Sequence, residues 1–335
     1  MFTKTARFFT QFFIYIILFL ILIIFLIGDF IPVDNYVTVP TKLLDINTIF
    51  LSIFLEAIPF VLLGVFISAL IQTFIKEDHL QRYIPSNPIV ATVPAVVIGA
   101  IFPVCECAIV PIVRRLIQKG MPLHVGFVIL VSAPILNPIV YLSTYYAFQS
   151  TPIIAHSRMG LALIVSLLIG LFIYFFYGNK NQLKNTDHAN HHTHDHDHHH
   201  HSSKLKETLY HASDEFFDMG KFLLFGALVA SVVQAYLARE TLLEIGSGTI
   251  SGPVAMMGLA YVLSLCSEAD AFVASSFKGV TSGAALLSFL VYGPMIDLKN
   301  TILLFAYFKK KFVMGFLIIV TFIVFWITLL YQLWM

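Results

Sequence analysis

The sequence predicts an all-α, polytopic membrane protein whose two halves are copies of one unit, and three observations lead to this fold class. Hydrophobic residues make up 58% of the 335 residues and charged residues only 12%, against roughly 25% charged residues in soluble domains. Apolar stretches long enough to cross a bilayer recur along the chain. Short patterns within residues 60–138 return within residues 222–298. We therefore expect about 8–10 transmembrane segments, including two proline-broken hairpins, in an inverted internal repeat.

The N-terminal region, residues 1–46, is predicted to be a transmembrane anchor followed by an external loop. Its apolar run, residues 8–31, is longer than the roughly 7–15 residues of a signal-peptide core and lacks a small-residue cleavage site. Lys4 and Arg7 precede this run, and cations are enriched on the cytoplasmic side of membrane spans. We expect an uncleaved helix with a cytoplasmic N-terminus.

Two membrane repeats follow, at residues 47–178 and 216–335, with a polar cytoplasmic loop at residues 179–215 between them. A helix needs about 20 apolar residues to cross the hydrocarbon core. This criterion predicts full spans at residues 47–75, 123–148, 159–178, 216–238, 282–308 and 312–334.

Two further apolar stretches, 89–118 and 253–278, do not fit single crossings because prolines and polar residues interrupt them. The first ends in Arg114 and Arg115, with Lys119 next. A hairpin that enters the membrane and returns keeps these cations in the cytoplasm. Three full spans then separate the starts of the two repeats, so the second copy is inverted. Irregular backbone inside a membrane needs protein or water around it, and the hairpins therefore predict a polar cavity.

Small and amide residues recur at matching places in the two copies. Gly64 and Gln72 in the first copy correspond to Gly226 and Gln234 in the second. Small residues let helices approach closely, and glutamine forms hydrogen bonds between helices. We expect packing roles for these residues rather than contacts with a substrate.

Three acids lie in the predicted hairpins: Glu106, Glu268 and Asp270. A charged side chain at membrane depth costs about 2.5–3.5 kcal/mol on insertion scales, so such residues usually have a function. One interpretation is that they bind a cation or a proton in the substrate path. The other is that they lie at helix ends, where they cap backbone amides.

All three cysteines of the chain accompany these acids: Cys105, Cys107 and Cys266. Thiolates prefer soft or borderline ions such as Cu(I), Zn(II) or trivalent arsenicals. Buried cysteine is also an ordinary small core residue, so a ligand role and a packing role both remain open.

Asn137 and Asp297 occupy matching positions in the two copies, beside prolines. Proline in a helix frees backbone carbonyl groups. The two polar side chains are therefore predicted either to satisfy the broken backbone or to line the substrate path.

A histidine-rich tract lies in the loop between the repeats, and nine of the 13 histidines fall within it. The tract has almost no apolar residues to bury and is predicted to be disordered. Imidazole and carboxylate groups together suit Zn, Ni, Cu or Co, and the alternative is a solvated spacer. The predicted metal-binding residues are His188, His191, His192, His194, His196, His198, His199, His200 and His201.

Several functions are disfavoured by the sequence. The net charge of +1 and the lack of a concentrated basic face disfavour nucleic-acid binding. The sequence has no Walker motif, no H-E-x-x-H motif and no C-x-x-C pair. We therefore expect no enzymatic activity and no cofactor.

The run Phe102-Pro-Val-Cys-Glu-Cys-Ala-Ile-Val-Pro111 and the run Ser132-Ala-Pro-Ile-Leu-Asn-Pro138 resemble the YraQ/ArsP-type family of predicted bacterial permeases. The resemblance extends from about residue 45 to residue 330. It implies a multi-pass permease of the bacterial cell (inner) membrane with a duplicated core. Some relatives in this family export methylated trivalent arsenicals.

The sequence thus predicts secondary transport of a soft metal or metalloid species, with efflux as the expected direction and protons as the expected coupling ion. Two alternatives remain: a permease for a small organic solute, and a membrane metal sensor. The expected partners are the lipid bilayer, the transported species, and a homodimer partner or an accessory subunit.

Overall fold

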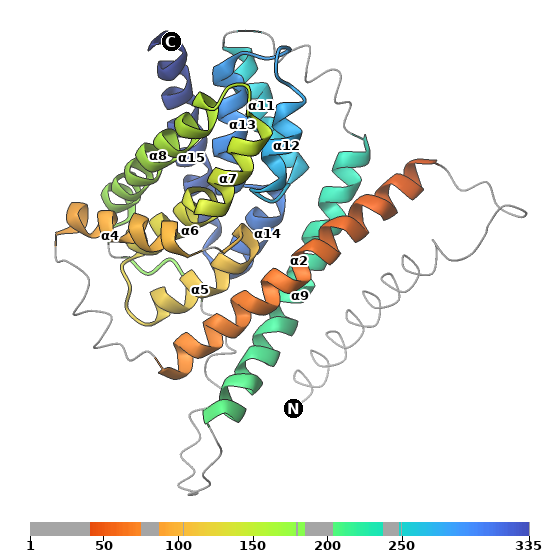
Figure 1. Cartoon of the computed structure of the whole chain (residues 1–335). Helices are drawn as coiled ribbons and strands as arrows, with labels where there is room; N and C mark the ends of the chain where they lie inside the picture. The colour runs from red at the N-terminus through yellow and green to blue at the C-terminus, as the bar shows by residue number, and fades with distance from the viewer. Residues whose placement is uncertain are drawn as a thin grey trace, which may run out of the picture.

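The computed structural model describes a purely helical membrane-type chain (Figure 1). The predicted anchor at residues 8–31 and the histidine-rich tract lie outside the described residues. Within the described part, all regular elements are α-helices, which confirms the all-α prediction there. The residues described are 41–74, 87–102, 104–178, 180–184, 204–236, 248 and 250–334.

The helices follow one another in two series. The first series is α2 (Thr41–Phe74), α4 (Pro88–Ile101), α5 (Glu106–Gln118), α6 (Leu123–Leu136), α7 (Pro138–Ala147) and α8 (Ile153–Tyr177). The second series is α9 (Lys204–Tyr236), α11 (Ser251–Leu263), α12 (Ala269–Ser275), α13 (Gly283–Met295), α14 (Leu298–Tyr307) and α15 (Lys310–Trp334). Each series has a long helix, four shorter helices and a second long helix, in that order.

Six helical segments of the described residues are long and apolar enough to cross a membrane. They overlap all six full spans predicted after residue 46, which confirms a multi-pass membrane protein. The six segments are Lys42–Thr73, Leu123–Ala147, Ile153–Tyr177, Glu215–Tyr236, Gly283–Tyr307 and Lys310–Leu333.

Two predicted spans are not continuous helices. The span predicted at 123–148 breaks at Asn137, between α6 and α7, because Pro138 disfavours helical backbone in the residue before it. The span predicted at 282–308 breaks between Met295 and Leu298, just after Pro294 in the last turn of α13. In both cases the polar residue at the break starts the next helix as its N-cap.

Three helix starts also differ from the expected boundaries. Helix α2 begins at Thr41, inside the predicted external loop and ahead of the predicted start at residue 47. Helix α8 begins directly after Pro152, ahead of the predicted start at residue 159, and so includes Arg158. Helix α9 begins at Lys204, inside the segment assigned to the polar loop. The first residues of α9, Lys-Leu-Lys-Glu, are good helix formers and extend the apolar helix into a polar region.

The two stretches predicted as hairpins each contain two short helices with non-helical backbone between them. Helix α4 ends at Ile101 and α5 begins at Glu106; helix α11 ends at Leu263 and α12 begins at Ala269. Ser264, the first residue after α11, has a left-handed backbone with φ of 47°. Because of these breaks, helix ends, where backbone amides or carbonyls lack partners within the helix, lie in the interior of the protein.

Helices α6 and α13 form the centre of the core. Buried residues make up 72% and 78% of the most apolar windows in the spans that contain them, against 28 to 39% in the other four spans. Phe127 of α6 makes edge-to-face contacts with three aromatic rings near the start of α15, with ring centroids 4.8–5.1 Å apart. Such pairs stabilise a core beyond the area they bury.

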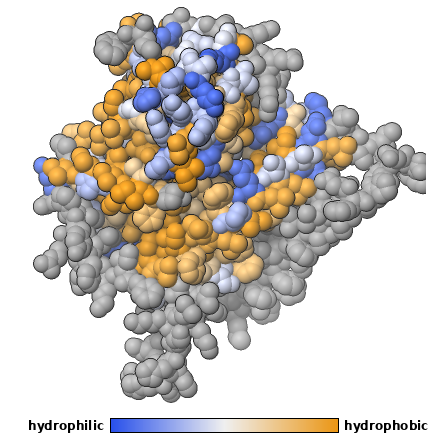
Figure 2. All heavy atoms as spheres, viewed as in Figure 1, coloured by the Kyte–Doolittle hydropathy of each residue, from blue (hydrophilic) through white to orange (hydrophobic). Residues whose placement is uncertain are grey.

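The outer helices present apolar side chains to the surroundings. Apolar residues cover much of the visible described face (Figure 2). Exposed side chains on α2, such as Leu55, Leu62 and Phe66, belong to this surface, which fits contact with lipid. Helices α2 and α9 lie side by side and pack together against α5 and α14 (Figure 1).

Candidate functional site

Helix N-termini from both series meet in the interior of the protein. Helix α5 contacts α14, and α12 contacts α7, so each contact joins the two series. A helix N-terminus carries a partial positive charge that stabilises nearby anions. Glu106 lies in the first turn of α5, Asp270 lies in the first turn of α12, and Asp297 caps α14.

The first charged cluster is centred on Lys299 of α14. Its Nζ lies 3.6 Å from Asp297 Oδ2 and 4.0 Å from Glu106 Oε1. All three side chains are buried. A buried charge is stable only when it is paired, and Glu106 therefore depends on a cation from the other series.

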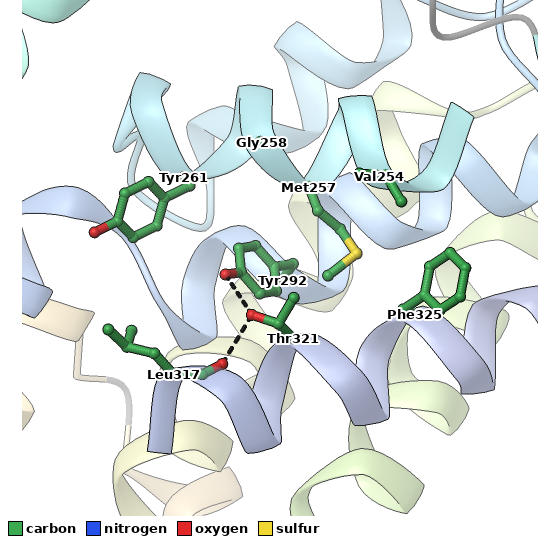
Figure 3. Close-up of a pocket in the computed structure, with 8 residues that line it drawn as sticks. All are labelled: Val254, Met257, Gly258, Tyr261, Tyr292, Leu317, Thr321 and Phe325. Carbon is green, nitrogen blue, oxygen red and sulfur yellow. Dashed lines mark hydrogen bonds between the residues drawn. The ribbon is translucent and has the colours of Figure 1, made fainter. Parts of the chain in front are cut away.

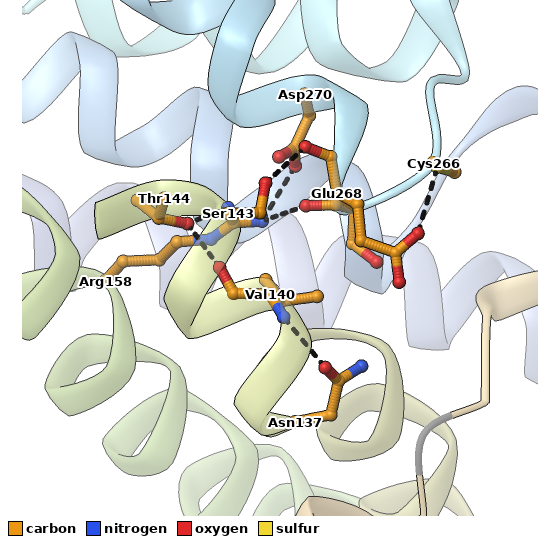
Figure 4. Close-up of polar contacts among 9 residues, drawn as sticks. Asn137, Val140, Ser143, Thr144, Arg158, Cys266, Glu268 and Asp270 are labelled. Carbon is orange, nitrogen blue, oxygen red and sulfur yellow. Dashed lines mark hydrogen bonds and ion pairs between the residues drawn. The ribbon is translucent and has the colours of Figure 1, made fainter. Parts of the chain in front are cut away.

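The second cluster is centred on Arg158 of α8. Its guanidinium group donates to Asp270 Oδ2 at 2.8 Å, to Thr144 Oγ1 at 2.7 Å and to the carbonyl of Ser267 at 3.2 Å (Figure 4). Arg158 has no solvent exposure. Like the first cluster, this one joins an acid of one series to a cation of the other.

Together the two clusters contain three carboxylates and two cations. With all groups ionised, the centre carries one negative charge in excess. Glu268 adds a further carboxylate at the edge, where it is half-buried. This arrangement favours binding of a positively charged species or a proton at the centre.

The three thiols surround these clusters. Cys107 is buried, whereas Cys105 and Cys266 are half-buried, and all three are free. The Cys266 Sγ lies 3.6 Å from Glu268 Oε2 (Figure 4). No group of three or more His, Cys, Asp and Glu side chains in the described ranges is arranged to hold a metal ion.

Asn137 stabilises the break that precedes α7. Its Oδ1 accepts from the amide of Val140 at 2.8 Å (Figure 4). Its Nδ2 donates to the carbonyl of Ala133 at 3.4 Å. Asp297 acts in the same way for α14, because its Oδ1 accepts from the amide of Asn300 at 2.6 Å. Each of these side chains thus accepts a hydrogen bond from a backbone amide at the start of the helix after the break, and Asp297 also pairs with Lys299.

Gly64, Gly226 and Gln234 make the packing contacts expected of them, whereas the side-chain oxygen of Gln72 is buried with no hydrogen-bond partner among the described residues. A Cβ added at Gly64 would lie 2.6 Å from Ala108 Cβ, so glycine lets α2 approach α5. A Cβ added at Gly226 would lie 3.5 Å from Lys299 Cα on α14. The Gln234 amide donates to the carbonyls that end α11, which is an interhelical hydrogen bond.

The sequence interpretation missed both buried cations. Arg158 lies one residue outside the predicted span 159–178, and Lys299 lies inside the span 282–308. An ionisable residue within a membrane span is a candidate functional residue by default. Applied to cations as well as acids, that rule identifies Lys299, but only the structure reveals its partners.

A separate apolar groove of about 370 Å³ lies between α11, α13 and α15 (Figure 3). Two hydrogen bonds join its lining residues: Tyr292 Oη with Thr321 Oγ1 at 2.9 Å, and Thr321 Oγ1 to the carbonyl of Leu317 at 2.8 Å. Its walls include Met257, Leu317 and Phe325. Since these walls are apolar and carry no charge, the groove is not the polar site.

Buried charges at broken helices, inside a bundle of apolar spans, are typical of membrane permeases. The chain belongs to the ArsP_1 family, described as predicted permeases, which matches residues 42–333. The expected resemblance to this family is confirmed, and membership implies a transporter rather than an enzyme.

Two relatives extend this finding. The UPF0718 protein YcgR of Bacillus subtilis is 47% identical over 287 residues, covering 86% of this chain and 96% of that protein. The "Putative two-component membrane permease complex subunit" of Streptococcus mutans is 37% identical over 277 residues, covering 83% of this chain and 91% of that protein. No solved structure gives a significant match.

Proposed function

We propose that this permease is a secondary transporter that exports a soft metal or metalloid species across the bacterial cell (inner) membrane in exchange for protons. One observation carries the proposal: buried ion pairs join an acid in the first turn of a helix of one half to a cation of the other half. Lys299 reaches Glu106 in this way, and Arg158 reaches Asp270. Charges placed between two halves respond when the halves move relative to each other.

An inverted repeat underlies this mechanism, and the helix lengths support it. Helices α7 and α14 have 10 residues each, and α8 and α15 have 25 residues each. Helices α2 and α9 have 34 and 33 residues. Repeats of this kind bind substrate between them, at discontinuous helices near the midplane.

The substrate class follows from the groups beside the charges. The excess negative charge favours a cation, and the thiols of Cys105, Cys107 and Cys266 favour a soft one. Cys105 and Cys266 are half-buried and therefore accessible to an entering ion. Glu106, Glu268, Asp270 and Asp297 supply carboxylates that exchange a cation for a proton.

The histidine tract has a supporting role in this proposal. We assign it to binding cytoplasmic metal before transport, through imidazole and carboxylate groups. The N-terminus and the tract both lie in the cytoplasm under the proposed orientation, which places cations on the inner side.

An accessory subunit is the proposed partner. The streptococcal relative is named as a subunit of a two-component membrane permease complex, and 37% identity over most of both chains supports a similar assembly here. A homodimer is the second arrangement, and co-purification distinguishes the two.

A small organic anion is the second candidate substrate, and the buried cations favour it. Lys299 and Arg158 bind carboxylates within the protein, and cations that bind internal carboxylates also bind carboxylates of a solute. For this candidate the thiols are packing residues.

The proposal is tested by elemental analysis of cells that produce the wild-type chain or the Cys105→Ser/Cys107→Ser variant. Cells are exposed to zinc, copper, cadmium, nickel, arsenite or methylarsenite, and membrane levels of the protein are matched. We expect the wild-type chain to lower the content of at least one element, and the variant to lose this effect. Equal contents for every element would contradict a thiol-bound metal or metalloid substrate.

A further inference from the structure

The paired helices α2 and α9 cover only one side of the polar centre. They pack against α5 and α14, whereas α12 and α7 pack mainly against each other and against α13 and α8. Within the described ranges, α9 makes no contact with α12 comparable to the contact of α2 with α5. Helix α9 opens the second series as α2 opens the first. The two series are therefore packed differently, because α2 packs against α5 whereas no described residues of α9 pack in this way against α12.

Backbone hydrogen bonds fix which residues of α5 and α12 correspond. The carbonyl of Cys105 accepts from the amides of Ala108 and Ile109 at 3.2 Å. The carbonyl of Cys266 accepts from the amides three and four residues later, those of Ala269 and Asp270, at 3.0 Å. Ala108 and Ala269 are therefore equivalent positions.

The equivalent faces of α5 and α12 differ in how far neighbouring helices bury them. Ala108 is fully buried beneath Gly64 of α2, whereas Ala269 is only half-buried. Three residues further along, Pro111 is buried while Phe272 is 56% exposed. No described helix covers the face of α12 that matches the α2-covered face of α5 as α2 covers α5.

A second pair, matched by its Lys-Gly sequence rather than by the register above, lies in the turns after these helices, because α12 ends sooner after Ala269 than α5 does after Ala108. Lys119-Gly120 follows α5 and Lys278-Gly279 follows α12, and both glycines are left-handed, with φ of 95° and 87°. Lys119 Nζ donates to the carbonyl of Gln72 on α2 at 3.1 Å. Lys278 Nζ instead donates to Ser150 Oγ, at the exposed turn before α8.

We propose that the uncovered face of α12 is a docking surface for α9 in a second, mirrored state of this chain. In that state Gly226 lies against Ala269, and Lys278 lies beside the carbonyl of Gln234. The contact between Gly64 and Ala108 opens at the same time. The inference deepens the proposed transport function and rests on its inverted repeat, because exchange between mirrored packings is how such repeats open to alternate sides.

The docking residues suit this exchange. Gly226 has no side chain, so it allows α9 to approach Ala269 as Gly64 allows α2 to approach Ala108. Among the described residues, the ion pair that must open is Arg115 with Glu215, at 3.4 Å between α5 and α9; its arginine is partly exposed and its carboxylate is buried. Because the arginine reaches solvent, opening this pair costs less than opening a pair with both partners buried.

The test is site-specific crosslinking in native membranes with a short bis-methanethiosulfonate linker. One variant carries Gln72→Cys with Lys119→Cys and reports the packing seen in this structure. The other carries Gln234→Cys with Lys278→Cys and reports the mirrored state. Linked peptide pairs are identified by mass spectrometry, which separates them from products of the native thiols, and the four single-cysteine variants are the controls.

We expect the yield of each linked peptide pair to exceed its yield in the single-cysteine controls several-fold. The yield of the second pair should rise with reaction time, since a crosslink traps even a minor state. Formation of the first pair with the second at control level would overturn the mirrored state. If both links form but flux measurements show no transport, only the transport assignment is lost, so the two failures are distinguishable.

Discussion

Arg158 and Asp270 carry opposite charges in a place where neither would be stable alone. Both are buried, and their closest atoms are 2.8 Å apart. Two further donors of Arg158 reach Thr144 and a backbone carbonyl, whereas its buried Nε has no hydrogen-bond partner in the described part of the chain. At the scale of single residues, the centre is therefore stabilised by pairing, and the loss of one partner leaves a buried charge.

This pairing predicts a large effect of Asp270→Asn on stability. Removing one partner of a buried ion pair costs about 3–5 kcal/mol, because Arg158 then remains buried and uncompensated. Thermal unfolding of the detergent-solubilised protein, followed by differential scanning fluorimetry, measures the change. The double variant Arg158→Met/Asp270→Leu removes both charges and should recover most of the loss.

The matched control is Asp218→Asn in the exposed part of α9. Asp218 pairs with Lys221 one helical turn away, and both side chains are partly exposed. Such pairs contribute about 0–1 kcal/mol, so this variant should unfold close to the wild-type temperature. Similar small shifts for Asp218→Asn and Asp270→Asn would contradict a buried, stability-determining pair.

At the scale of helices, the close contact of α2 with α5 depends on glycine. Gly64 faces the Cβ and the backbone carbonyl of Ala108, each 2.6 Å from an added Cβ. That is shorter than any real Cβ contact, so even alanine would push the helices apart. The neighbouring Cys107 and Glu106 belong to the same helix, which links this packing contact to the polar centre.

We therefore expect Gly64→Ala to lower stability, whereas Gly258→Ala does not. A Cβ at Gly258 meets no atom within 4 Å, and alanine is favoured over glycine in a helix by about 1 kcal/mol. Unfolding temperatures of the two variants measure the difference. A Gly64→Ala protein as stable as wild type would show that α2 does not pack tightly on α5.

The helix breaks show what the sequence determines locally. Pro138 predicts a break at Asn137 through its effect on the preceding residue, and the amide side chain then caps the next helix. The break at Asp297 has no proline directly after it, only Pro294 three residues before it, although both segments are predicted alike as full spans. There the N-cap hydrogen bond of Asp297 and its pairing with Lys299 stabilise the break. The apolar composition of the segment does not predict this break.

The partners of the buried charges could not be predicted from the sequence. Glu106 and Lys299 are far apart in the chain and meet only because α5 packs on α14. The same holds for Arg158 and Asp270, which meet because α7 packs against both α8 and α12. Composition and span length predict the membrane class, but contacts between the halves are tertiary and leave no local signal.

At the scale of the whole molecule, the two halves are joined through their charges. Each half contributes a cation and at least one acid, so relative movement of the halves changes both pairs together. In the proposed cycle, Glu106 releases its proton as a soft cation binds beside the thiols, and regains it when the cation leaves. Glu106 is therefore the residue on which coupling depends most directly.

The most direct test is proton movement in energised inverted membrane vesicles, followed with a pH-sensitive dye, for wild type, Glu106→Gln and the control Asp218→Asn. Zinc, copper(I), cadmium, arsenite and methylarsenite are added separately. The proposed mechanism predicts that at least one of them releases protons from wild-type and Asp218→Asn vesicles but from none containing Glu106→Gln. Equal responses of wild type and Glu106→Gln would contradict transport coupled through this carboxylate.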